Sequence, residues 1–428
     1  MSTAWSASPG RVAKWAQLAL IAADEQRRTL KARTDPDRAL TTARSESAAE
    51  FLCAELSARG LPFDVIEAER IIAAAIGPRP EGDADAERSQ RARDELVLQH
   101  LGAGPTVDLR NPSDVRAMLR RVGVDVPNTR AGQLELHRDA HPVVEALLTW
   151  RKAERIATTY GYRWLDEHVT DGRLRGAWTS SDGAAGRMTA SSGLHNLPAD
   201  LRSAVAAERG CVLVRADLGQ IEPRVLAAVS GDEALIAATR EDDLYQPVAS
   251  RLHVTREKAK VAVLAAMYGA TTGTSAQALH GLERAYPTAM AVLEQAAAAG
   301  RAGEDVYTLG GRRVRMWVDD SVEGDIDRAR RVAAARGRFA RNAVIQGAAA
   351  EFFKVWAVTV RARTATLGAE IVLCLHDELL VQCREEVAPE VASLVERSVS
   401  ESAARWSPRR DVRFVADVSV VGRWSDVT

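Results

Sequence analysis

Two aspartates follow short apolar runs in this sequence. Asp217 comes shortly after Cys211–Val214 (CVLV), and Asp377 lies inside the charged triplet His376–Glu378, which interrupts the apolar stretch IVLCL…LLVQC. If both runs are strands of one sheet, the two carboxylates meet at its edge. Mg²⁺ takes oxygen ligands, few of them from protein, and substrate phosphates complete its shell. Two such ions about 4 Å apart polarise an attacking hydroxyl and stabilise a leaving pyrophosphate.

Each motif taken singly has a structural alternative. Asp217 could accept main-chain N–H groups as the cap of the helix that follows it. The triplet at Asp377 could be an exposed hairpin turn, where aspartate is common. These alternatives stay open at the level of the single motif.

A third segment, Thr255–Gly273 (TREKAKVAVLAAMYGATTG), carries cations at helical spacing. Arg256 and Lys260 are four residues apart and Tyr268 follows eight residues after Lys260, so the three share roughly one helix face. A cationic face that ends in a ring suits a triphosphate at one end and a base at the other. The alternative is a solvated basic face.

The elements that must position these residues are of mixed type. Up to about residue 170 the sequence is almost entirely helical, with a helix in Ser45–Asp64 stopped by Gly60, and one long helix or two joined ones in His141–Val169. After the CVLV strand, helical sequence runs to about residue 300. A hairpin in Val306–Met316, more helix and a strand–turn–strand over Glu370–Cys383 follow. We therefore predict an α+β fold: a helical arm, then a small antiparallel sheet with a large helical insertion.

Composition limits the class of protein. The 428 residues have a formal net charge of −1, with 46% hydrophobic and 27% charged residues, as in soluble globular proteins. No apolar run reaches the roughly 18 residues that span a bilayer, and the N-terminus lacks a signal-peptide pattern. The four cysteines form no CxxC pair that would suggest zinc. We expect a cytoplasmic, nucleoid-associated protein with reduced thiols and no membrane partner.

Taken together, the motifs resemble those of the family-A DNA polymerases, the DNA polymerase I family. ADLGQIEPRVLAAVSGD is similar to motif A of that family, REKAKVAVLAAMYG to motif B and LCLHDELLV to motif C, and they occur in the family's order. GRMTASSGLHNLP, TLGGRR, RNAVIQGAAAEFFK and TWRKAERIATTY resemble further family segments. The matches are collinear over about residues 46–428.

The resemblance implies a role for each catalytic residue. Asp217 and Asp377 would hold two Mg²⁺ ions, with Mn²⁺ as the alternative metal, helped by the main-chain carbonyl of Leu218. Glu378 would support them. Lys260 would grip the triphosphate and protonate the departing pyrophosphate.

It also implies a set of binding residues. Glu222 would exclude a 2′-hydroxyl from the incoming nucleotide, the alternative being a surface carboxylate paired with Arg224. The remaining nucleotide-binding residues would be Arg256, Lys260, Leu264, Tyr268, Tyr245 and Gln220, with Tyr268 stacking at the templating position. The DNA-binding residues would be Arg187, Asn196, Arg312, Asn342, Gln346 and His376; a polar stripe on a helix is the alternative for Asn342 and Gln346.

Some positions depart from the family pattern. Leu218-Gly219 replace the usual Tyr-Ser, and Leu264 replaces an aromatic ring beside the nucleotide, so we expect weaker nucleotide affinity. Tyr245 stands where the family has a phosphate-contacting histidine, and His195 replaces a glutamine. About 45 residues precede the resemblance, without an Asp-x-Glu on a strand, so we expect no exonuclease activity.

The implied architecture is a right hand of palm, fingers and thumb. We expect an N-terminal helical segment at 1–45, thumb and preceding helices at 46–150, palm at 151–232 and 341–428, and fingers at 233–340. The implied function is addition of dNTPs to a primer 3′-hydroxyl on primer–template DNA, in replication or repair, by a monomer that could bind a protein through its first helices. The alternatives are a polymerase of different specificity and a polymerase-derived, non-catalytic DNA-binding or repair partner.

Overall fold

The computed structural model describes residues 8–426 except 34, 103, 105, 270–274 and 318–324; of residues 275–279 it describes only the backbone. The chain divides into two compact units. Unit 1 comprises Met1–Ala58, Ala177–Thr189 and Arg209–Val421, and unit 2 comprises Arg59–Gly176, Ala190–Glu208 and Gly422–Thr428. Each unit is described by itself.

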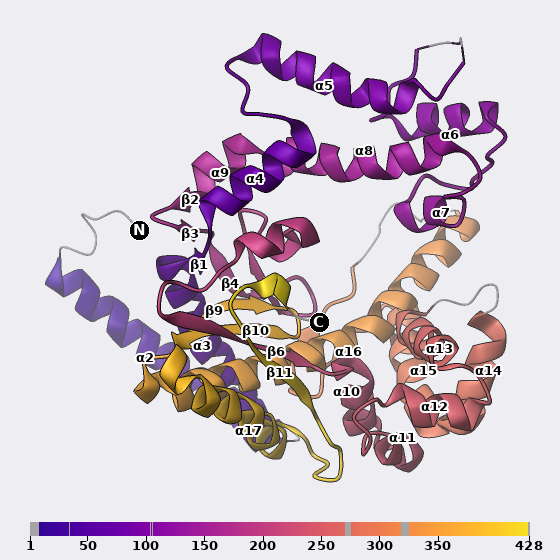
Figure 1. Cartoon of the computed structure of the whole chain (residues 1–428). Coiled ribbons are helices and arrows are strands. Elements are labelled where there is room, and N and C mark those ends of the chain that lie inside the picture. Colours follow the sequence, from indigo (N-terminus) through magenta and orange to yellow (C-terminus); the bar gives the residue numbers. More distant parts are fainter. Residues whose placement is uncertain are drawn as a thin grey trace. The chain divides into compact units, whose positions relative to one another are not determined.

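A four-stranded antiparallel sheet is the centre of unit 1 (Figure 1). Its order is β11-β6-β10-β9. The strands are β6 (Cys211–Leu218), β9 (Glu370–Leu375), β10 (Glu378–Arg384) and β11 (Ala416–Val421). Because β6 pairs directly with β10, Glu378 lies opposite Asp217. The shared sheet expected from the two apolar runs is therefore confirmed.

Two long helices pack with this sheet. α16 (Ile326–Thr364) is capped by Asp325, whose carboxylate accepts the N–H of Arg328, and α17 is Ala388–Trp406. They are joined by aromatic packing: the Phe352 ring stacks on Phe414 at 4.3 Å and meets Trp406 edge-on at 5.3 Å. By length and composition alone α16 is apolar enough to cross a membrane, but 89% of its most apolar 18-residue stretch is buried inside the protein. In this fold it is a core helix.

The helical insertion follows β6. It consists of α10 (Ile221–Ser230), α11 (Glu233–Ala238), α12 (Tyr245–Leu252), α13 (Arg256–Tyr268), α14 (Ser275–Ala285) and α15 (Pro287–Ala302). α10 ends at Gly231, whose φ of 66° is left-handed and costs little for glycine. Thr255 caps α13 by accepting the N–H of Lys258, and Gly269 ends it. In Figure 1, α12 to α15 gather beside one end of α16, and α15 packs along it.

The N-terminal helices also belong to unit 1. α2 (Pro9–Lys31) buries no residue, whereas α3 (Pro36–Arg59) buries one face. α3 is joined to α16 by two ion pairs. The fully buried ammonium of Lys354 lies 2.5 Å from Glu46, and Arg361 donates to both oxygens of Glu55 at 2.7 and 2.5 Å.

Two small hairpins complete unit 1. β4 (Trp178–Asp182) pairs with β5 (Arg187–Ala190), and β7 (Val306–Tyr307) pairs with β8 (Arg313–Val314). The second pair confirms the hairpin expected in Val306–Met316.

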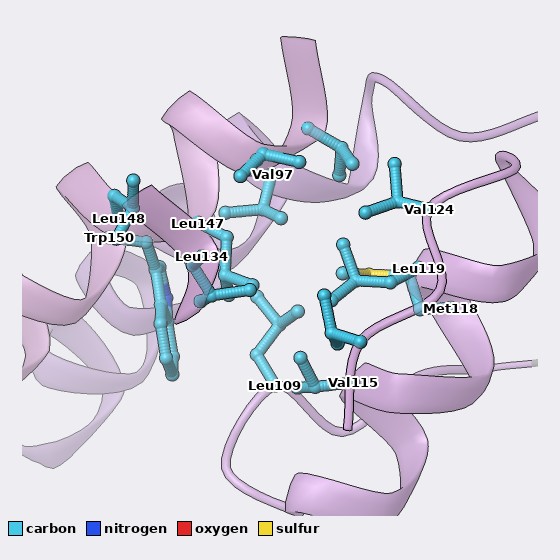
Figure 2. Packing of buried hydrophobic residues seen from close by; sticks show 13 residues of the cluster. Val97, Leu109, Val115, Met118, Leu119, Val124, Leu134, Leu147, Leu148 and Trp150 are labelled. Atoms are coloured by element: carbon cyan, nitrogen blue, oxygen red, sulfur yellow. The ribbon is translucent and has the colours of Figure 1, made fainter. Parts of the chain in front are cut away.

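Unit 2 is largely helical. It holds α4 (Val65–Ile76), α5 (Asp83–Leu98), α6 (Pro112–Arg121), α7 (Ala131–Glu135), α8 (Pro142–Thr159) and α9 (Tyr162–His168). A small sheet joins β1 (Leu61–Pro62), β3 (Arg173–Leu174) and β2 (Val169–Thr170). Figure 2 shows the hydrophobic core of unit 2. Leu147 and Leu148 of α8 belong to one cluster with Val97, Met118 and Leu134 from α5, α6 and α7.

The α+β class is confirmed, and the helical sequence at His141–Val169 forms two helices, α8 and α9, that break at Tyr160-Gly161. The cap interpretation of Asp217 is wrong, because Asp217 lies within β6 and the N-cap of α10 is Gln220. The division into two units does not follow the expected subdomain boundaries, and the assignment of palm, fingers and thumb stays a prediction.

Candidate active site

A cavity of about 310 Å³ opens in unit 1 where the sheet meets the helical insertion. It lies between β5, the start of α10, α12, α13, α16 and the turn between β9 and β10. Eight of the residues singled out from the sequence line it: Arg187, Gln220, Glu222, Tyr245, Leu264, Tyr268, His376 and Asp377. Larger cavities, of about 440 and 580 Å³, occur elsewhere, so the side chains of this cavity and not its volume make it the candidate site.

The two aspartates lie at the ends of the two inner strands of the sheet, β6 and β10, beside this cavity. Asp217 is near the end of β6, and Asp377 occupies the two-residue turn before β10, where its carbonyl accepts the N–H of Leu218 at 2.9 Å. Burial and the neighbouring Asp217 raise the pKa of Asp377 to about 6. Burial also raises the pKa of Asp217, against the pull of Arg215. The pair therefore shares a desolvated, electronegative place that favours a cation.

The turn itself has an unusual backbone. His376 has a φ of 55°, in the left-handed region that non-glycine residues rarely adopt. It is exposed and lines the cavity next to Asp377. Such conformations cost roughly 1–3 kcal/mol and persist where the surrounding structure imposes them. Here the apolar strands on both sides fix the turn.

Glu222 projects from the first turn of α10 into the cavity. Its two oxygens accept separate hydrogen bonds, one from Arg187 at 3.0 Å and one from the hydroxyl of Tyr268 at 3.0 Å. The alternative in which Glu222 pairs with Arg224 is wrong. Arg224 is fully buried, points elsewhere and donates to main-chain carbonyls.

Arg224 has a structural role that the sequence did not indicate. Its guanidinium donates to the carbonyls of Gly219, Thr239, Glu241, Asp242 and Arg413 at 2.6–3.0 Å. Burial lowers its pKa to about 10. Gln220, expected to bind nucleotide, lines the cavity, but its side-chain oxygen accepts hydrogen bonds from the N–H of Leu244 and from Arg224. Together they fix the start of α10.

Arg256, Lys260 and Tyr268, expected on one helix face, all lie in α13, and of these three Tyr268 lines the cavity. Leu264 and Tyr268 line the cavity, and Arg256 lies with its guanidinium 5.9 Å from the ring of Tyr245. Arg256 also donates to Asp243 at 2.5 Å, a partner that the sequence did not indicate. Lys260 is exposed on the same helix. Burial raises the pKa of Tyr245 to about 12, so it stays neutral.

The expected DNA-binding residues are placed less uniformly. Gln346 shares a hydrogen bond with Tyr268, and Asn342, one turn earlier on α16, has a buried side-chain oxygen without a hydrogen-bond partner. Arg312 is held by Glu46 at 2.9 Å and by Ser181 at 3.0 Å. Asn196 is exposed in unit 2, in the short turn Leu194–Asn196, so its place relative to the cavity is not defined.

The donor set fits a magnesium ion of the kind that relies on its substrate. Within the described ranges no group of three or more histidine, cysteine, aspartate or glutamate side chains is arranged to hold a metal ion. A pair of carboxylates nevertheless meets the requirement of Mg²⁺, which takes one or two carboxylates and completes its shell with phosphates and water.

Comparison with known proteins identifies the family of this chain. The family model for DNA polymerase family A matches residues 103–426. The chain is 33% identical over 310 residues to a thermostable DNA polymerase I of Thermus filiformis, a match that covers 64% of this chain and 36% of that protein. It is 33% identical over 304 residues to DNA polymerase I of Chloroflexus aurantiacus, covering 64% and 31%. The chain thus matches about a third of the length of these relatives.

A solved structure shares the fold. The POL domain of Pol1 from M. smegmatis, in complex with DNA primer-template and dNTP, superposes with a TM-score of 0.72 at 24% identity. The match covers 89% of this chain and 70% of that one. With a family match that spans most of the chain and contains all three motifs, this chain belongs to DNA polymerase family A.

Proposed function

We propose that this chain is a DNA-directed DNA polymerase that adds dNTPs to a primer 3′-hydroxyl on a DNA template. The observation that carries the proposal is the cavity in which Asp377, Glu222 and the Leu264–Tyr268 face of α13 meet beside Asp217. Relatives named DNA polymerase I and the solved structure with primer-template and dNTP support it.

Residues of this chain would divide the work in the following way. Asp217, Asp377 and the carbonyl of Leu218 would hold two Mg²⁺ ions, which when bound supply the charge that activates the 3′-hydroxyl and offsets the leaving pyrophosphate. Arg256 and Lys260 would orient the triphosphate, and Lys260 would donate a proton to pyrophosphate. Phosphoryl transfer depends mainly on such positioning and charge neutralisation.

Glu222 would set the preference for deoxynucleotides. It is buried on one side, and Arg187 and Tyr268 hold its carboxylate from two directions, so it cannot turn away from a ligand without losing two hydrogen bonds. A 2′-hydroxyl placed against this fixed wall would clash or leave a polar group unpaired. We infer that dNTPs are preferred over rNTPs.

Primer extension tests the proposal. The natural chain is incubated with a recessed primer–template, dNTPs and Mg²⁺ beside Asp377→Asn and, as a matched control, Asp411→Asn, which neutralises an exposed aspartate of an ion pair with Arg409. We expect extension by the natural chain and the control, and a loss of at least a hundredfold in Asp377→Asn. Equal primer binding by all three without extension by any would favour the non-catalytic alternative.

We also propose that these 428 residues carry no exonuclease activity. The Asp-x-Glu sequence in the first hundred residues, Asp85-Ala86-Glu87, lies in helix α5, and Asp85 is bound to Arg88 at 2.9 Å. A primer with a labelled 3′-terminal mismatch should keep its label in the presence of Mg²⁺ and chain. Release of the label would contradict the proposal.

A further inference from the structure

Three carboxylates lie in one row across the sheet, and the middle one, Asp217, is a candidate metal ligand. The register places Asp417 of β11 directly opposite Asp217 of β6, and Asp217 directly opposite Glu378 of β10. Residues that face each other across paired strands project from the same side of the sheet. Like charges in such positions destabilise a sheet. The row therefore requires a source of positive charge.

Arg215 supplies it. It precedes Asp217 by two residues on β6, so its side chain leaves the same face of the sheet. Each nitrogen of its guanidinium lies near a different carboxylate: Nε is 2.5 Å from Glu378, Nη2 3.4 Å from Asp217 and Nη1 3.8 Å from Asp417. The side chains of Arg215 and Glu378 are only 15% and 7% exposed. The shortest and most buried of the three contacts is the one to Glu378.

This arrangement determines which carboxylates are available to a cation. A charge-assisted bond of 2.5 Å in a poorly hydrated place is strong, and breaking it would leave a buried charge unpaired. Glu378 is thus held by a resident cation, while Asp217 meets the same guanidinium at a longer distance and Asp377 shares no ion pair with it among the described contacts. Asp217 and Asp377 are therefore the carboxylates offered to a divalent ion. The adjacent Glu378 is held by Arg215, and Asp417, the other end of the row, is 77% exposed and meets the guanidinium only at 3.8 Å.

We propose that Arg215 is a positioning residue that keeps Glu378 out of metal coordination and weakens the binding of divalent cations to the free protein. This inference rests on the proposed function. Metal would bind tightly only together with nucleotide phosphates, which add ligands and negative charge at the moment of reaction. Without Arg215, Glu378 would turn to the cation and the site would bind metal before substrate arrives.

Mn²⁺ binding to the protein alone tests the inference. The free Mn²⁺ signal in electron paramagnetic resonance is titrated with the natural chain and with Arg215→Gln, without DNA or nucleotide. We expect Mn²⁺ to bind the variant at least about tenfold more tightly, because one positive charge leaves and one carboxylate is released within a few ångströms of the ion. The matched control is Arg384→Gln, which removes the same charge from an exposed pair with Glu386 and should change the affinity less than about twofold.

A double variant assigns the effect to Glu378. In Arg215→Gln/Glu378→Gln the tighter binding should disappear; if it persists, the effect is one of general charge and the inference fails. Unchanged binding by Arg215→Gln also overturns it. Should Arg215→Gln not fold, Arg215→Lys, which keeps the charge but cannot bond three carboxylates, should bind Mn²⁺ more tightly than the natural chain, and equal binding would overturn the inference.

The titration is independent of catalysis, so the two proposals can fail separately. If the natural chain extends primers but Arg215→Gln and the natural chain bind Mn²⁺ with equal affinity, only the proposed role of Arg215 is wrong. If no extension is seen while Arg215→Gln binds Mn²⁺ more tightly, the control of cation binding stands and the polymerase proposal falls.

Discussion

Leu264 is the cavity residue whose chemistry departs most from what a flat nucleobase or sugar would prefer. It lines the cavity one helical turn before Tyr268, and an aliphatic side chain there offers contact area without a ring. Base–aromatic stacking contributes about 1–3 kcal/mol in nucleic-acid sites. The affinity for nucleotide should therefore be limited at this position.

The substitution Leu264→Phe should lower the KM for dNTP by about threefold to tenfold, at the low end of the stacking range. Steady-state primer extension at varied dNTP concentration measures KM and kcat separately. Leu264→Ile, which keeps an aliphatic side chain, serves as the control. An unchanged KM in Leu264→Phe would show that this side chain does not contact the nucleotide.

Asp377 gives the metal-free protein a pH dependence whose sign can be stated. Its pKa is about 6 in the folded chain and 3.8 when unperturbed, so between these values the folded state binds the extra proton. Stability then falls as pH rises through this window, because the folded state must ionise a buried group. The cost is fully present above about pH 6 and absent below about pH 4.

We expect Asp377→Asn to stabilise the metal-free protein by on the order of 2 kcal/mol at pH 8 and by much less at pH 4.5. Urea unfolding in the presence of EDTA at the two pH values measures the difference. Added Mg²⁺ should remove the advantage of the variant, since only the natural chain gains binding energy. An advantage of equal size at both pH values would mean that ionisation of Asp377 is not its cause.

At the scale of elements, Arg224 fastens the start of α10 to the segment that leads into α12. Its guanidinium donates to five main-chain carbonyls. Four of them belong to other segments, three before α12 and one before β11, and the fifth, that of Gly219, lies between β6 and α10. Since α10 carries Glu222 into the cavity, a displaced α10 would displace the wall that faces the nucleotide.

Arg224→Met should therefore cost about 3–5 kcal/mol of unfolding free energy, the range for removing one partner from a buried polar cluster. Arg224→Lys should recover only part of it, because one ammonium cannot reach the same carbonyls. Denaturant unfolding monitored by circular dichroism provides the values. A loss below about 1 kcal/mol in Arg224→Met would show that water or a main-chain shift satisfies these carbonyls.

Sequence patterns predicted these elements better than they predicted the partners of individual side chains. The apolar runs around Asp217 and Asp377 indicated strands packed against a core, and in the structure β6 and β10 pair directly in one sheet. The helical spacing of Arg256, Lys260 and Tyr268 was predictable because the geometry of a helix alone sets it. The partner of Arg224 was not, because main-chain carbonyls carry no sequence signal.

The position of Arg215 on the sheet could have been predicted from the sequence. Alternation along β6 places it on the face of Asp217, which period-two reasoning could have shown. Its contact with Glu378 and Asp417, however, depends on the register of three strands, which no local pattern specifies. Arg312 was expected to bind DNA, but its guanidinium forms an ion pair with Glu46 of α3, which is far from it in the sequence. No local sequence pattern indicates this partner.

For the whole molecule, α2 is a long helix that contributes little to packing. None of its residues is buried, and Trp15, Leu18 and Ile21 are 53–65% exposed. Helices in water owe most of their stability to a packed apolar face. α2 thus adds little to the cooperative unfolding of unit 1.

Deletion of residues 1–31 should leave the unfolding midpoint of the remaining chain within about 1–2 °C of its original value, corresponding to less than about 0.5 kcal/mol. Differential scanning calorimetry of both chains measures this. Primer extension by the shortened chain should also be retained. A large fall in the midpoint would reveal that α2 packs against the rest of the chain in solution.

The ion pairs between α3 and α16 set an order of events during synthesis. Glu55 and Arg361 lie 306 residues apart in the sequence, and Glu46 and Lys354 are separated by a similar number of residues. At translation rates of about 5–20 residues per second, α3 spends roughly 15–60 s outside the ribosome before its partners are made. Throughout that time its carboxylates remain hydrated and its apolar face has nothing from α16 to cover it. A nascent chain of this protein therefore offers chaperones an exposed helix until nearly all of it has been translated.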